Sequence, residues 1–135
     1  MVHYHWRAGG VRRVIERTLP GFASALGTRE VVLLGGEKPP SDWLEWLRAA
    51  MPEGISLRVE TLPDLGYVAE MAHPPDPRRI TRCVAPLLAT PAGVPGAVVW
   101  MHNPGLVKNP AVPAGIIPLL DSTAARAIFH HHDFW

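Results

Sequence analysis

Short apolar runs alternate along the chain with longer stretches of helical periodicity. The runs have the length of buried β-strands and are flanked by glycine or proline; they cover residues 2–4, 31–34, 55–59, 97–101 and 127–130. Between them, apolar positions recur every three or four residues, which predicts helices over 11–26, 43–50 and 77–88. A fourth helix is predicted to open at Asn109-Pro110, and the proline and glycine residues inside it make it a poor or kinked helix.

Two acidic residues are predicted to cap helices. Asp42 has Glu45 three residues later, which is the spacing of a capping box. Asp76 precedes Pro77, a residue favoured at the first helical position. On the helix after Pro77, Cys83 is predicted to lie on the apolar stripe as a buried, inert thiol.

Five strands separated by helical connections predict an α/β fold with a parallel sheet. The expected fold is a single doubly wound, Rossmann-like domain spanning residues 1–135, with strand order 3-2-1-4-5. In such a sheet the ligand crevice lies at the carboxyl ends of strands 1 and 4, where the winding reverses. The turn-rich stretch 61–75 is left unassigned.

The net charge and the cysteine content limit the kinds of binding partner and the cellular compartment that we expect for this chain. The 135 residues include 13 Lys+Arg and 12 Asp+Glu, a net charge of +1, which disfavours a nucleic-acid surface or a polybasic membrane patch. No apolar run approaches the ~20 residues of a membrane span, so we expect no transmembrane segment, although peripheral association stays open. The single cysteine suits a reducing compartment, and the expected location is cytoplasmic.

Six of the seven histidines follow the ends of three strands that the predicted sheet places side by side. The polar residues at these ends are His3, His5 and Arg7, then His102 and Asn103, then His130, His131, His132 and Asp133. They suit a polar-ligand site that uses imidazole donors. A metal site on His130, His132 and Asp133 is an alternative, but the spacing matches no established metal motif, so we expect neither a metal nor a cofactor. The structural alternative is that two or three histidines are satisfied core or surface residues, which is expected for His3, His131 and His73.

Two further features belong to the same expected crevice. Gly9-Gly10 lies between a strand and a helix, where a backbone without side chains and a helix N-terminus favour an anion. An ordinary tight turn is the alternative, since the pair has neither dinucleotide-binding nor Walker spacing. Lys108 is either a cation beside the crevice or a solvated side chain. Trp43 and Trp46 are interpreted as packing residues.

Three segments together resemble the N-terminal, acceptor-side domain of retaining GT-B glycosyltransferases of the family 4-like group. They are residues 3–11 (HYHWRAGGV), residues 102–110 (HNPGLVKNP) and residues 129–135 (FHHHDFW). The resemblance implies transfer of a sugar from a nucleotide-sugar donor to an acceptor. It also implies that Gly9 and Gly10 approach the donor diphosphate and that His132, the catalytic candidate, contacts the donor sugar. The acceptor-side candidates are His5, Arg7, His102, Asn103, Lys108 and Asp133.

Such enzymes have a second domain that holds the nucleotide, and nothing in this sequence corresponds to it. We therefore expect the chain to be inactive alone. The alternative is a stand-alone, non-catalytic module of the same fold that binds a phosphorylated ligand or a glycan, or that pairs with a separate subunit. We also expect apolar surface near residues 2–5 and 127–135 to be uncovered and to favour self-association.

Overall fold

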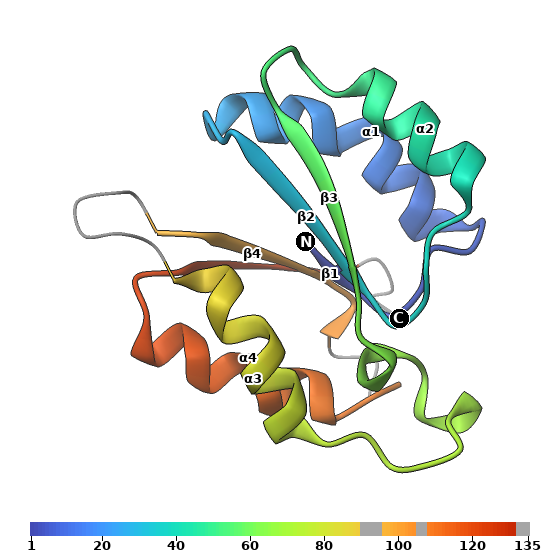
Figure 1. The fold of residues 1–135 in the computed structure, drawn as a ribbon, viewed down its shortest axis with the longest axis vertical. Coiled ribbons are helices and arrows are strands. Elements are labelled where there is room, and N and C mark those ends of the chain that lie inside the picture. The colour runs from blue at the N-terminus through green and yellow to red at the C-terminus, as the bar shows by residue number, and fades with distance from the viewer. Residues whose placement is uncertain (90–95, 105–107, 132–135) are drawn as a thin grey trace.

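The computed structural model describes residues 1–89, 96–104 and 108–131. The strands form one parallel sheet in the order β3-β2-β1-β4-β5 (Figure 1). Their bounds are β1 (Val2–His3), β2 (Glu30–Gly35), β3 (Ser56–Thr61), β4 (Val98–His102) and β5 (Arg126–His130). The sequence-based prediction of a doubly wound α/β sheet in the order 3-2-1-4-5 is therefore confirmed.

Helices cover both faces of the sheet (Figure 1). α1 (Gly10–Ala25) and α2 (Ser41–Ala50) lie on one face, and α3 (Pro77–Leu88) and α4 (Ala111–Ser122) lie on the other. The central strands are apolar on both sides because each face contributes to a separate core. Leu33 is fully buried against α1 and α2, and Met101 is buried against α3 and α4.

Glycine allows the two helices of the second core to pack closely. A Cβ on Gly115 of α4 would lie 2.7 Å from the Pro77 carbonyl oxygen and 2.8 Å from the Ile80 Cβ atom, both on α3. The Thr81 hydroxyl donates to the Gly115 carbonyl oxygen at 2.9 Å and ties the pair together. The glycine that weakens the sequence signal for α4 is thus required by its contact with α3.

Of the two predicted helix caps, one is confirmed and one is wrong. The Asp76 carboxylate accepts the backbone N–H of Arg78 at 2.9 Å, so Asp76 caps α3 as expected. α2 instead begins at Ser41, with Pro40 at the cap position, and Asp42 lies inside its first turn. The backbone of Pro40 is extended, so the helix begins one residue before Asp42. Asp42 is exposed in the first turn, where its negative charge lies at the positive end of the helix.

Three predictions about burial also need correction. Cys83 is exposed, because the buried stripe of α3 runs through Ile80, Val84 and Leu88. Trp43 is buried as a packing residue, whereas Trp46 is half exposed on the outer side of α2. Apolar surface was also predicted near residues 2–5, but Val2, His3 and Tyr4 are buried and His5 is partly buried.

Phe129 on β5 is 45% exposed, which agrees with the expected apolar surface at that edge. Residues 132–135, the remainder of that predicted surface, lie outside the described residues. No helix in the described part of the chain has the length and apolar character needed to cross a membrane.

Candidate functional site

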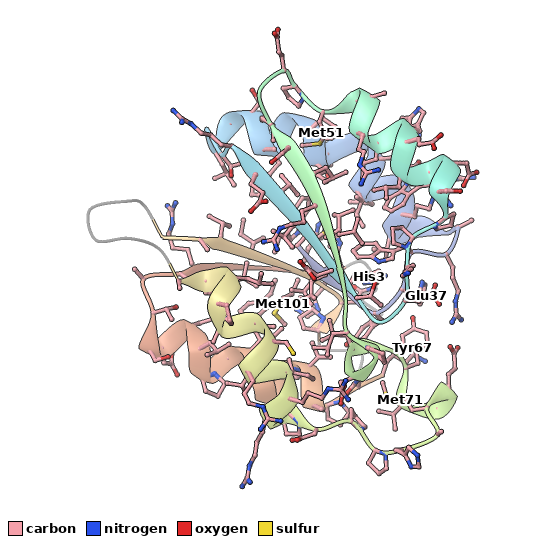
Figure 2. The ribbon with its side chains drawn as sticks, viewed as in Figure 1. His3, Glu37, Met51, Tyr67, Met71 and Met101 are labelled. Carbon is pink, nitrogen blue, oxygen red and sulfur yellow. The ribbon has the colours of Figure 1, made fainter. Side chains whose placement is uncertain are left out.

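A hollow of about 170 Å³ opens at the carboxyl ends of β1 and β4, where the strand order predicts a crevice. Its lining comes from four places: the connection after β1, the first turn of α1, the end of β4 and the segment between β3 and α3. The lining residues are His3, Tyr4, His5, Arg7, Gly9, Gly10, Val11, Arg12, Tyr67 and Asn103. Figure 2 shows His3, Glu37 and Tyr67 near one another at this edge of the sheet.

Histidine and tryptophan rings from three adjacent strands pack against one another next to the hollow. The His102 ring centroid lies 6.0 Å from that of His3, 5.1 Å from that of His130 and 4.7 Å from that of Trp100. His3 and His102 are both buried. The predicted clustering of strand-end histidines is therefore present for these residues, and it forms a packed aromatic floor.

His5 reaches across the hollow to Tyr67. Its Nδ1 atom accepts the backbone N–H of Arg7 at 3.3 Å, which leaves the ring proton on Nε2. Nε2 lies 3.0 Å from the Tyr67 hydroxyl oxygen and therefore donates to it. Burial, followed by the positive charge of Arg7, lowers the pKa of His5, so the imidazole is neutral near pH 7.

Arg7 holds two carboxylates at the rim of the hollow. Its guanidinium lies 3.1 Å from a Glu37 carboxylate oxygen and 2.6 Å from one of Glu70. These hydrogen bonds raise the pKa of Arg7, and they lower the pKa of Glu70. All three side chains are solvated, so the network orders the rim more than it stabilises the fold.

The N-terminus of α1 forms one wall of the hollow. Gly9 occupies the cap position in an extended conformation and supplies no side-chain acceptor, and the first turn contains no acidic residue. A Cβ on Gly9 or on Gly10 would meet no atom within 4 Å, so both backbones face open space. The positive end of the helix macrodipole is therefore exposed to the hollow.

Arg12 adds a positive charge to the same wall. It pairs with Glu16 at 3.0 Å along the helix, and its guanidinium carbon lies 5.1 Å from the ring centroid of Trp43. The ring and the carboxylate hold the guanidinium at the base of the hollow. Arg12 was not among the predicted site residues, and the structure places it at the lining.

Asn103 ends β4 in an unusual backbone conformation. Its φ is 51°, and among the described residues it is the one position other than glycine in that region. Its N–H donates to the His130 carbonyl oxygen at 2.7 Å, and its own carbonyl accepts the Tyr4 hydroxyl at 3.4 Å. Strain of this kind is characteristic of functional sites, and Asn103 lines the hollow.

Asn109 fixes the segment that carries Tyr67. Its side-chain amide donates to the carbonyl oxygens of Asp64 and Gly66 at 2.7 and 2.8 Å, and its Oδ1 atom accepts the N–H of Ala111 at 3.0 Å. Asn109 is fully buried. It therefore joins the start of α4 to the 3-10 turn Pro63–Leu65.

The structure brings together five of the predicted site residues, namely His5, Arg7, Gly9, Gly10 and Asn103. Lys108 lies beside them and points its ammonium at the Tyr67 ring, 5.9 Å from the centroid. His102 is in the aromatic floor and does not line the hollow. The predicted residues His132 and Asp133 lie outside the described residues.

Sequence reasoning missed Tyr67, Glu37 and Glu70. Tyr67 and Glu70 belong to the unassigned stretch 61–75, and Glu37 follows the glycine pair that ends β2. The predicted topology could have indicated these residues, because every segment that follows a strand of a parallel sheet starts at the carboxyl edge, where the ligand crevice lies. Polar and aromatic residues just after β2 and β3 were therefore candidates on topology alone.

In the described ranges, no group of three or more His, Cys, Asp or Glu side chains is arranged to hold a metal ion. The functional groups of the hollow are imidazole, phenol, guanidinium and backbone N–H groups around a helix N-terminus. Comparison of the chain with protein-family models, with curated proteins and with solved structures found no match.

Proposed function

We propose that this chain is the acceptor-side, Rossmann-like domain of a glycosyltransferase that uses a nucleotide-sugar donor. The observation that supports it is the hollow at the carboxyl ends of β1 and β4, walled by the uncapped N-terminus of α1. The donor diphosphate lies against Gly9 and Gly10. The acceptor approaches from the side of His5, Arg7 and Asn103.

The backbone at the N-terminus of α1, which includes Gly9 and Gly10, is suited to binding a diphosphate. The first N–H groups of a helix have no acceptor within the helix, and here no side chain caps them. Phosphate oxygens can accept these N–H groups while the helix macrodipole attracts their charge. No protein atom fills the space beside Gly9, so a phosphate can approach the backbone there without any movement of the protein.

The chemistry of glycosyl transfer fits the remaining residues. Negative charge develops on the departing diphosphate, and fixed N–H donors aimed at it lower the barrier. The family resemblance assigns contact with the donor sugar to His132. The same resemblance places the nucleotide-holding residues in a second domain, so we expect no sugar transfer by residues 1–135 alone.

A glycine substitution tests the diphosphate contact without disturbing the fold. Gly9→Ala places a methyl group in the hollow, where it blocks close approach of phosphate, and it meets no protein atom. We expect it to weaken binding of UDP or GDP about tenfold, equivalent to about 1.4 kcal/mol, in a calorimetric titration. Gly21→Ala, on the exposed side of the same helix, is the matched control and leaves the affinity unchanged.

Equal affinities in the two variants, or no nucleotide binding by the parent chain, would contradict the diphosphate contact. Binding of an oligosaccharide without any binding of nucleotides would instead favour the glycan-binding module. Thermal unfolding of both variants controls for a change in fold.

A further inference from the structure

Two arginine side chains line the hollow, and they differ in how many of their donor groups are already used. Arg7 donates from Nε, Nη1 and Nη2 to the carboxylates of Glu37 and Glu70. In the described part of the chain, Arg12 donates from Nε alone, to a Glu16 carboxylate oxygen at 3.0 Å. Its Nη1 and Nη2 groups make no hydrogen bond to any described residue, so Arg12 keeps a pair of donors for a ligand.

Two contacts hold the Arg12 guanidinium in place. Its central carbon lies 5.1 Å from the ring centroid of Trp43. Trp43 is 2% exposed and stacks on Trp6, with ring centroids 5.8 Å apart, so the ring is itself fixed. The Glu16 carboxylate, four residues further along α1, holds the Nε side of the group. A guanidinium held in this way loses less conformational entropy when it binds an anion.

Arg12 also lies close to the backbone that the first phosphate is proposed to contact. Arg13 donates to the Gly9 carbonyl oxygen at 3.1 Å, so the N–H groups of the three residues before it have no acceptor within the helix. Three residues of helix rise about 4.5 Å, and helical side chains lean toward the N-terminus. The wall therefore carries two kinds of donor within one helical turn: backbone N–H groups and a guanidinium.

We propose that Arg12 binds the second phosphate of the donor diphosphate, so that the hollow distinguishes a nucleoside diphosphate from the corresponding monophosphate. The inference rests on the proposed function, which places the first phosphate at Gly9 and Gly10. The Nη1 and Nη2 groups form a planar fork that matches two oxygens of one phosphate. A monophosphate occupies the backbone site alone and leaves this fork to water.

The other cations near the hollow are not placed for this role. Arg7 lies between two carboxylates, 3.1 Å from an oxygen of Glu37 and 2.6 Å from one of Glu70, so a phosphate there would meet more negative than positive charge. The Lys108 ammonium lies 5.9 Å from the centroid of the Tyr67 ring, beside the hollow. Both remain candidates for the acceptor side, and the second phosphate goes to Arg12.

UDP and UMP, compared on the parent chain and on two matched variants, test the proposal. Arg12→Gln removes the fork and its charge. Arg13→Gln removes the same charge one residue along the helix, at an exposed position that does not line the hollow. Affinities come from the Gly9 and Gly10 amide signals in NMR titrations. We expect Arg12→Gln to weaken UDP binding about tenfold and UMP binding less than about twofold, and Arg13→Gln to change both by less than about twofold.

Glu16→Gln gives a second readout of opposite sign. The amide oxygen can still accept the Arg12 Nε–H, but the negative charge that competes with the phosphate is gone. We expect this variant to bind UDP about twofold more tightly, with a smaller change for UMP. Because the contact between Arg12 and Trp43 is retained, this result holds even if Arg12→Gln lowers Tm through lost packing.

A ratio of UDP to UMP affinity that is the same in the Arg12→Gln chain as in the parent would overturn the inference. An equal loss in the Arg13→Gln chain, or no gain in UDP affinity in the Glu16→Gln chain, would also overturn it. In these cases UDP still shifts the Gly9 and Gly10 signals, so the proposed function stands. If UDP shifts neither signal in the parent chain, the proposed function fails, and the inference fails with it.

Discussion

Asn109→Asp is expected to lower the free energy of unfolding by about 3 kcal/mol or more at neutral pH. The substitution keeps the size of the side chain and replaces its donating amide with a carboxylate oxygen. That oxygen would face the carbonyl oxygens of Asp64 and Gly66, which the amide now reaches at 2.7 and 2.8 Å. Because Asn109 is fully buried, water cannot relieve the repulsion.

Chemical denaturation of the two chains measures this loss. Asp42→Asn is the control, because it makes the reverse chemical change at an exposed position, and we expect it to alter stability by no more than about 1 kcal/mol. An Asn109→Asp chain as stable as the parent would show that the segment around Tyr67 is held by other contacts.

Gly36→Ala is expected to destabilise the fold by about 2–3 kcal/mol. A Cβ at this position would lie 2.6 Å from the Gly66 Cα atom and 2.7 Å from the Tyr4 carbonyl oxygen. Both obstacles are backbone, so neither can rotate away. The end of β2 must therefore move away from the connection after β1, and the wall of the hollow moves with it.

Gly21→Ala is the matched comparison for this second prediction. It lies within α1, where the added methyl group meets open space, and we expect it to stabilise the chain by about 1 kcal/mol. Thermal or urea unfolding compares the two substitutions. Effects of the same sign would contradict the packing described at Gly36.

Topology was predictable because it depends on repeated patterns. The continuous apolar run of β2 and the Asp76-Pro77 signal of α3 are local features that the tertiary structure reinforces. Cys83 was misplaced because two residues of α3, Cys83 and Val84, could both belong to an apolar stripe. In the structure Val84 lies on the buried stripe with Ile80 and Leu88, and Cys83 lies outside that stripe and is exposed.

The candidate site was only partly predictable, for a different reason. His5, Gly9 and Asn103 follow predicted strands, so topology brings them together. The segment that carries Tyr67 is held by two hydrogen bonds from Asn109, which span more than forty residues of sequence and which no local pattern reports. The sequence likewise predicts β1 as a strand, but it does not show how far β2 and β4 extend beyond it.

The most direct test of the proposed function is to locate nucleotide binding on the chain by NMR. UDP and GDP are added up to about 10 mM, where a ligand with Kd about 1 mM is close to saturating. We predict that the amide signals of Gly9, Gly10, Val11 and Asn103 shift together. Shifts confined to other parts of the chain, or no shift at these four amides, would contradict a donor diphosphate bound at the N-terminus of α1.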